Sequence, residues 1–172
     1  IDAGLHAWLK QYFETEIADG QLQLVHGDML DREERFHPEV EAWWQAASTP
    51  PRLVSNLPYS ISGPFLGRLP GRALSGACLL LQKEVAHKAV GRESGALPVR
   101  LQLNFETTLG RSLPPEVFWP RPQIASAFLH LVPRDDAPSA EENQMLTRIL
   151  GLGFGQRRKR LLSRLCKQYP QA

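Results

Sequence analysis

The sequence has little cysteine and no long apolar run. Its two cysteines, Cys78 and Cys166, have neither the spacing of a disulfide framework nor that of a zinc site. No stretch approaches the roughly 18 consecutive apolar residues that a membrane span needs, and no signal peptide is visible. We therefore expect a protein of the reducing cytoplasm, without a membrane partner and without a metal.

Acidic residues are absent from the stretch between Gln144 and Ala172, although the formal net charge of the whole chain is only +2. The cations of that stretch are Arg148, Arg157, Arg158, Lys159, Arg160, Arg164 and Lys167. Charge of one sign on a helical segment predicts a face that binds a polyanion. A basic amphipathic helix is also commonly an ordinary solvated face, and this alternative stays open.

The chain has no methionine at its first position, and we expect it to be a fragment or a chain that has lost its start. Its 172 residues, of which 42% are hydrophobic, allow one sizeable core with a small appendage.

Helical and strand signals alternate along the sequence, which predicts an α/β fold. The expected elements are a helix over 5–13, a strand over 22–25, a short helix after Pro38, a strand at 53–54, a helix over 61–69 interrupted at 63–64, a strand over 77–81 buried on both faces, a helix over 83–90 and a strand over 127–132. The window 99–103 fits a strand or a helix equally well.

A change of composition near Pro133 predicts a domain boundary. The polar segment 134–138 reads as a linker, and Ser139 with Glu142 has the spacing of a capping box that begins a helix. We therefore expect a main domain over 1–134 and a C-terminal helical region over 135–172.

The most informative motif is Asn56-Leu57-Pro58-Tyr59, which follows a predicted strand. The Asn56 side chain and the Leu57 carbonyl are hydrogen-bond acceptors, and Pro58 restrains Leu57 to an extended conformation. Tyr59 adds a flat face for stacking. Two acceptors aimed at one exocyclic amino group would orient its nitrogen for methyl transfer, as at N6 of adenine. The alternative is an ordinary strand that ends in a turn.

Two further features lie where such a site would need them. Asp28, after the predicted strand 22–25, would accept a hydrogen bond from a bound adenine ring at the crevice where open α/β sheets hold nucleotides. A carboxylate that caps a turn is the simpler reading of Asp28. In the run 118–126, alternating prolines stiffen a loop that presents Phe118 for stacking opposite Tyr59, unless Phe118 belongs to the core.

In this order the motifs resemble the ribosomal-RNA adenine dimethyltransferases of the KsgA/RsmA type, within the superfamily that includes the Erm enzymes. The residues that carry the resemblance are 56–59, the Gln-Lys-Glu-Val-Ala signature at 82–86, the F-x-P-x-P loop at 118–126 and the Phe-Gly-Gln-Arg-Arg-Lys element at 154–159. The resemblance implies a Rossmann-like methyltransferase domain followed by a small helical domain, with S-adenosylmethionine as methyl donor. It implies two adjacent adenines in the 3′-terminal hairpin loop of small-subunit (16S) rRNA as substrate, and the assembling 30S subunit as partner.

The roles implied by the resemblance fall on three groups of residues. The base pocket comprises Asn56, Leu57, Pro58, Tyr59 and Phe118, and the cofactor site comprises Asp28, Met29 and Asn56. The residues expected to engage rRNA phosphates are Lys83, Arg157, Arg158, Lys159 and Arg160. We expect a monomer, direct transfer of the methyl group, and no metal.

One departure from the family pattern and three rival interpretations stay open. The family's glycine-rich cofactor loop and the acidic residue that holds the cofactor ribose would precede Ile1, so we expect weak cofactor binding and no activity from the chain as it stands. An Erm-type enzyme for 23S rRNA and a DNA adenine methyltransferase share parts of the pattern. The third alternative is not an enzyme but a non-catalytic RNA-binding factor in ribosome assembly.

Overall fold

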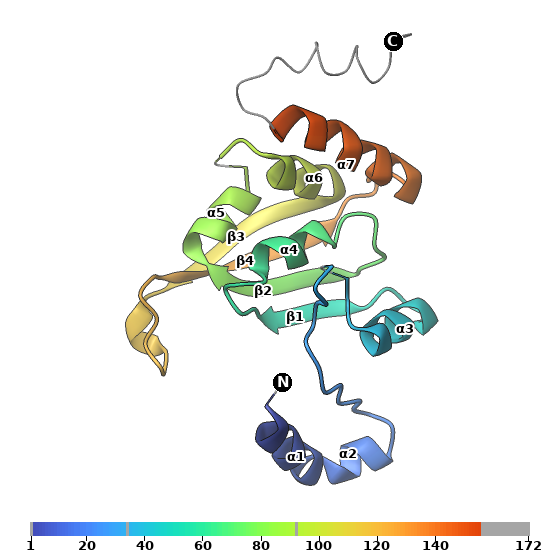
Figure 1. Cartoon of the computed structure of the whole chain (residues 1–172), viewed down its shortest axis with the longest axis vertical. Helices are drawn as coiled ribbons and strands as arrows, with labels where there is room; N and C mark the ends of the chain where they lie inside the picture. The colour runs from blue at the N-terminus through green and yellow to red at the C-terminus, as the bar shows by residue number, and fades with distance from the viewer. Residues whose placement is uncertain (1, 34, 92, 156–172) are drawn as a thin grey trace. The chain divides into compact units, whose positions relative to one another are not determined.

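The computed structural model describes residues 2–33, 35–91 and 93–155, and its elements are drawn in Figure 1. The chain divides into two compact units, 1–48 and 49–172. Within the described ranges, no helix has the length and apolar content needed to cross a membrane.

The first unit contains three helices, α1 (Ala3–Tyr12), α2 (Glu14–Ala18) and α3 (Pro38–Ala46). Helix α1 begins where the Asp2 carboxylate accepts a hydrogen bond from the Leu5 backbone N–H at 2.9 Å. Helix α3 begins at Pro38, whose missing N–H costs nothing in a first turn, and the His37 ring caps it. The helices expected over 5–13 and after Pro38 are thus confirmed.

The strand expected over 22–25 is wrong, because residues 22–26 have no regular secondary structure. Leu22, Leu24 and Val25 are half-buried, so the apolar pattern reflects packing. A strand also needs a partner for its backbone groups, and among the described residues of this unit the only bridge joins Leu30 to Phe36. Alternating apolar residues do not make a strand without that partner.

The second unit is built on a mixed four-stranded sheet in the order β1-β2-β4-β3. Its strands are β1 (Arg52–Asn56), β2 (Gly76–Gln82), β3 (Phe105–Leu113) and β4 (Ser126–Pro133). Strands β1 and β2 are parallel, and β4 runs antiparallel to both β2 and β3. It follows that β1, β2 and β3 share one direction, so their carboxyl ends lie at one edge of the sheet.

The core of this unit forms where β2 and β4 meet the helices. Leu79, Leu81, Leu129 and Leu131 are almost fully buried, which confirms the continuous apolar run 77–81 as a strand covered on both faces. The helices of the unit are α4 (Ser62–Gly67), α5 (Lys83–Ala89), α6 (Ala96–Asn104) and α7 (Ala140–Phe154). Helix α6 packs against α4, α5 and α7.

Two expectations about these helices are resolved, and one strand is new. The segment 63–64 does not interrupt α4, because Pro64 lies in its first turn, where backbone N–H groups need no intrahelical acceptor. The ambiguous window 99–103 is helical, within α6. Strand β3 was not expected from the sequence, and its register shifts between Leu109 and Ser112.

Helix α7 is joined to α6 by a buried pair of amides. Asn104 and Asn143 donate to each other's side-chain oxygens at 2.8 and 2.9 Å. Asn143 also donates to the carbonyls of Pro138 and Ser139, and Asn104 accepts from the Gly71 backbone N–H. The capping box expected of Ser139 and Glu142 is present. The domain boundary at 134–135 stays a prediction.

Candidate base-binding site

Three of the sequence motifs meet at one edge of the sheet. Strand β1 ends at Asn56, β2 ends at Gln82, and β3 ends at Leu113, all with the same direction. Strand β4 begins at Ser126, which pairs in register with both Gln82 and Leu113. Segments far apart in the sequence therefore converge at the carboxyl ends of the strands, the place where open α/β sheets bind ligands.

The motif at 56–59 begins with one exposed and one buried residue. Asn56 is exposed at the end of β1, whereas the Leu57 side chain is only 3% exposed and anchors the backbone in the core. The Leu57 N–H donates to the Leu80 carbonyl at 3.1 Å. Among the described residues, no donor occupies the Asn56 side chain or the Leu57 carbonyl. Neither oxygen is thus taken by a donor of the described chain, and the Asn56 side chain is exposed to a ligand.

The backbone after Leu57 turns tightly around Pro58. The Pro58 carbonyl accepts hydrogen bonds from the Ile61 N–H at 3.2 Å and from the Ser62 hydroxyl at 3.1 Å. Ser62 is fully buried at the start of α4, so this turn is tied to the core. The turn fixes the position from which the Tyr59 side chain leaves the backbone.

Tyr59 is connected to the F-x-P-x-P motif at 118–126 by a hydrogen bond between hydroxyl groups. Its phenolic oxygen lies 2.9 Å from Oγ of Ser126, which is 1% exposed. A ring anchored at its hydroxyl end can rotate little, and Tyr59 remains only half-buried. An aromatic face held in one orientation is suited to stacking on a planar heterocycle. This link was not predicted from the sequence, although Ser126 belongs to the F-x-P-x-P motif.

Phe118 lies in the loop that connects β3 to β4. A single 3₁₀ turn, η1 (Pro115–Val117), precedes it, and its backbone is extended. Its side chain is half-buried, so it is not a residue of the closed core. Among the described residues, no ring contact joins Phe118 to Tyr59. Its stacking opposite Tyr59 therefore stays a prediction.

The Gln-Lys-Glu-Val-Ala motif at 82–86, which follows β2, supports the same loop. The Lys83 backbone N–H donates to the Ala125 carbonyl at 2.9 Å, immediately before Ser126. The Lys83 side chain is exposed at the first turn of α5. It is therefore available at this edge of the sheet to an anionic partner, while its backbone holds the loop.

The proposed cofactor residues Asp28 and Met29 belong to the first unit. Because no strand precedes them, Asp28 lies in an irregular segment and not at a strand end as expected. Its carboxylate accepts a long hydrogen bond of 3.5 Å from the Leu30 N–H, the turn-capping geometry of the simpler reading. The carboxylate is exposed and keeps acceptor capacity, so its chemistry suits the amino group of an adenine ring.

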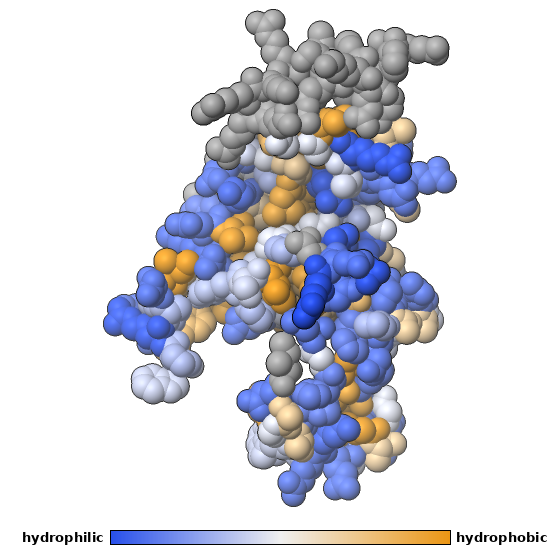
Figure 2. Space-filling model, in the orientation of Figure 1, coloured by the Kyte–Doolittle hydropathy of each residue, from blue (hydrophilic) through white to orange (hydrophobic). Residues whose placement is uncertain are grey.

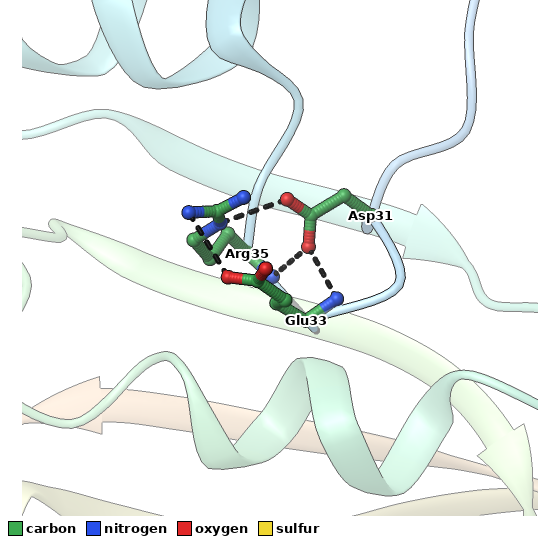
Figure 3. A network of polar contacts seen from close by, with 3 residues as sticks. All are labelled: Asp31, Glu33 and Arg35. Carbon is green, nitrogen blue, oxygen red and sulfur yellow. Dashed lines mark hydrogen bonds and ion pairs between the residues drawn. The ribbon is translucent and has the colours of Figure 1, made fainter.

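A network of polar contacts orders the turn that follows these residues (Figure 3). The Asp31 carboxylate accepts from the Glu33 and Arg35 backbone N–H groups and from the Arg35 guanidinium, each at 2.8 Å. These contacts, first among them the Arg35 backbone hydrogen bond, lower the pKa of Asp31. The His37 N–H donates to the Met29 carbonyl at 3.0 Å, which closes the turn and fixes the backbone of Met29.

The remaining RNA-binding predictions lie outside the described residues. These are Arg157, Arg158, Lys159 and Arg160. Within the described ranges, no group of three or more His, Cys, Asp or Glu side chains could hold a metal ion.

The sheet and the polar groups at its edge define a class of protein, the Rossmann-like methyltransferases. Comparison with known proteins identifies the family. The sequence model of the ribosomal RNA adenine dimethylase family matches residues 1–172, and the chain belongs to this family.

Curated relatives of the chain share the name "Ribosomal RNA small subunit methyltransferase A". The relative from Xanthomonas campestris pv. campestris (strain B100) is 40% identical over 158 residues, which are 86% of this chain and 57% of the relative. The relative from Nitratidesulfovibrio vulgaris Hildenborough is 40% identical over 121 residues, 67% of this chain and 46% of the relative. The chain thus spans about half the length of the curated relatives that it matches.

Two solved structures share the fold. The 23S rRNA methyltransferase ErmE has a TM-score of 0.65 and 20% identity, with 99% of this chain and 66% of that chain covered. A dimethyladenosine transferase from Plasmodium falciparum has a TM-score of 0.64 and 20% identity, with 96% and 57% covered. At this identity the two structures establish the Rossmann-like methyltransferase fold.

Proposed function

We propose that the chain is part of an enzyme that uses S-adenosylmethionine to dimethylate N6 of two adjacent adenines in the 3′-terminal hairpin loop of 16S rRNA. One observation carries this proposal. In a chain of the rRNA adenine dimethylase family, two acceptors without donors, on Asn56 and Leu57, stand beside an aromatic ring that Ser126 holds in place. That set matches the edge and the face of an extruded adenine.

In the proposed mechanism the protein mainly positions the reacting nitrogen. The Asn56 side-chain oxygen and the Leu57 carbonyl accept hydrogen bonds from the N6 hydrogens, which directs the nitrogen lone pair away from them. Tyr59 and Phe118 stack on the two faces of the base. The bound donor supplies a methyl group that is already electrophilic because it is carried by a sulfonium. Asp28 and Met29 would hold the adenine ring of the donor, with the Asp28 carboxylate as acceptor, and Asn56 would contact the donor as well as the target base.

Contacts outside the pocket would position the RNA without reading its sequence. Lys83 lies exposed at the same edge of the sheet, and the cluster at 157–160 adds four cations in the sequence. The proposed partner is 16S rRNA within the assembling 30S subunit, and the proposed working form is a cytoplasmic monomer without a metal.

Asn56→Ala tests the chemistry in the full-length protein. Loss of a hydrogen bond to the reacting amino group should reduce methyl transfer to undermethylated small subunits by about 10²-fold or more. Affinity for S-adenosylmethionine should fall far less than turnover, because Asn56 is only one of the residues proposed to contact the donor. Ser60→Ala is the matched control, because Ser60 is exposed one residue beyond the motif. Near wild-type turnover of Asn56→Ala would overturn the proposed role.

The substrate is tested separately from the pocket. Methyl incorporation should occur in small-subunit RNA and not in protein-free 23S rRNA. Incorporation into 23S rRNA alone would establish the Erm-type alternative. Binding of RNA without any incorporation, in a full-length protein that binds S-adenosylmethionine, would establish the non-catalytic one.

A further inference from the structure

Trp119 is 96% exposed, although an indole ring is among the largest apolar surfaces that a side chain can bury. A single exposed apolar residue is common on protein surfaces and needs no special explanation. Trp119 differs because of where it lies and how its loop is built.

The loop that carries Trp119 is braced from both sides. Four prolines, Pro114, Pro115, Pro120 and Pro122, limit its backbone. The Val117 and Phe118 N–H groups donate to the carbonyls of Pro114 and Pro115. Arg121 forms an ion pair with Glu116 across the tip. The indole is therefore presented on a restrained backbone, which reduces the entropic cost of binding a ligand there.

The base of the loop is part of the proposed adenine pocket. The loop leaves β3 at Leu113 and enters β4 at Ser126, and it projects from the sheet beyond those strand ends (Figure 1). Ser126 bonds Tyr59, and the Ala125 carbonyl accepts from the Lys83 N–H. A nucleotide bound at Asn56 and Tyr59 would therefore have its neighbours along the RNA near this loop.

The surroundings of Trp119 favour a nucleic-acid base over an apolar partner. Arg121 and Gln123 are exposed beside it, and the tip of the loop is coloured blue to white in the space-filling view (Figure 2), although Val117 and Ile124 of the same loop are also exposed. An apolar partner needs a contiguous patch, whereas one flat ring is enough to stack on one base, and the contact tolerates any base. Arg111, exposed on β3, adds a cation for a phosphate near the loop.

We propose that Trp119 is a stacking platform for an unpaired base of the RNA substrate that lies next to the methylated adenine, outside the pocket of Asn56 and Tyr59. This inference rests on the proposed function and extends it to a second contact that sets affinity for the RNA.

The binding test uses a protein-free RNA hairpin that copies the 3′-terminal loop of 16S rRNA with both adenines unmethylated. Trp119→Ala should weaken binding about tenfold or more, the size expected of one stacked base. Trp119→Phe should keep binding within about threefold, because it keeps an aromatic face. Trp43→Ala is the control, since Trp43 is also an exposed tryptophan but lies in α3.

The stacked nucleotide is identified by removing bases one at a time. At one loop position an abasic site should weaken wild-type binding by the same factor, and the same site should have no further effect on Trp119→Ala. Unchanged affinity of Trp119→Ala for the hairpin would overturn the proposal. Weaker binding to 30S particles but not to protein-free RNA would also overturn it, because the partner would then be a protein.

Turnover in the full-length protein separates this inference from the proposed function. Trp119→Ala should raise KM for the RNA and leave kcat at saturating RNA near that of the wild type. If KM is unchanged while Asn56→Ala still abolishes turnover, only the stacking inference fails. If Asn56→Ala retains full turnover, the proposed function fails whatever Trp119 does.

Discussion

The hydroxyl groups of Tyr59 and Ser126 lie 2.9 Å apart, although 67 residues separate them in the sequence. Tyr59 belongs to the motif that ends β1, and Ser126 is the first residue of β4. This hydrogen bond joins the aromatic wall of the proposed base pocket to the loop that carries Phe118 and Trp119. In the proposed function, Ser126 is thus a positioning residue, which acts through the Tyr59 ring.

A double-mutant cycle measures this link. Tyr59→Phe and Ser126→Ala each remove one hydroxyl, and the double variant removes both. We expect a coupling free energy of about 1 kcal/mol in urea unfolding, the usual net size of such a hydrogen bond. Ser126→Thr keeps a hydroxyl and should restore turnover in the full-length protein more than Ser126→Ala does. Additive effects on stability together with equal turnover of the Thr and Ala variants would contradict the positioning role.

The buried amides that hold α7 provide a second prediction. Asn143→Ala removes the two hydrogen bonds that join it to Asn104, whose side chain keeps only its bonds with Gly71 and Arg100, and we expect a decrease of about 2 kcal/mol in the free energy of unfolding. Asn143→Asp should cost more than Asn143→Ala, because it places a buried negative charge against two acceptor oxygens, Oδ1 of Asn104 and the Pro138 carbonyl. Gln144→Ala, one residue further and exposed, is the control and should stay within about 0.5 kcal/mol.

Equal stability of the two Asn143 variants would contradict the reciprocal amide pair. Amide hydrogen exchange gives an independent check. If the pair secures the start of α7, exchange should quicken in α7 of Asn143→Ala more than in β2.

The start of α7 also predicts a dependence on pH. Hydrogen bonds with Ser139, first that from its backbone N–H, lower the pKa of the Glu142 carboxyl. A lowered folded-state pKa means that this interaction stabilises the helix above the unfolded value of about 4.3, and that the effect is lost as the pH falls through the folded value. The protection factors of the first α7 amides, which are corrected for the intrinsic pH dependence of exchange, should therefore fall on acidification below about pH 4.

Glu142→Gln supplies the comparison for this prediction. Glutamine retains a side-chain oxygen that accepts from the Ser139 N–H but does not titrate in this range. Its α7 amides should lack the acid transition that the wild type shows. An identical acid transition in both proteins would assign the effect to another group.

The sequence pattern predicted the secondary structure correctly where local signals and tertiary packing agree. The run at 77–81 is apolar throughout because β2 is buried on both faces, and Ser139 with Glu142 begins α7 through contacts within four residues. The expected strand at 22–25 failed for lack of a partner strand in its unit, a property that its own residues do not encode. Strand β3 was missed because its exposed and half-buried residues do not alternate strictly.

In the candidate site, too, local features could be predicted and long-range contacts could not. The acceptors of Asn56 and Leu57 could be predicted because they are a property of one short motif. The hydrogen bond between Tyr59 and Ser126 could not, because it depends on the register that places β4 beside β2 and β3. Asp28 was expected at a strand end because the apolar pattern of 22–25 predicted a strand before it. When that strand proved wrong, the expected position of Asp28 was wrong with it.

The basic cluster at 157–160 allows a prediction that separates RNA binding from chemistry. If these four cations follow the phosphate backbone, their replacement by Gln should weaken binding to 16S rRNA and flatten its salt dependence. The slope should fall by roughly 0.7 to 0.9 log units for each phosphate that is no longer neutralised. Turnover on saturating substrate should change far less. A matched control replaces four exposed cations elsewhere and so removes the same charge, namely Lys10, Arg32, Arg52 and Lys88.

The competing role for the cluster is to hold the helical region through acidic residues of the linker. Two of those residues already have partners, since Asp136 accepts from the Arg134 guanidinium and Glu142 from the Ser139 N–H. Exposed Asp135 and Glu141 would contribute little as surface ion pairs. We therefore expect the fourfold variant to show weaker affinity and a flatter salt slope while its melting temperature stays close to that of the wild type. A lower melting temperature with an unchanged slope would establish the structural role instead.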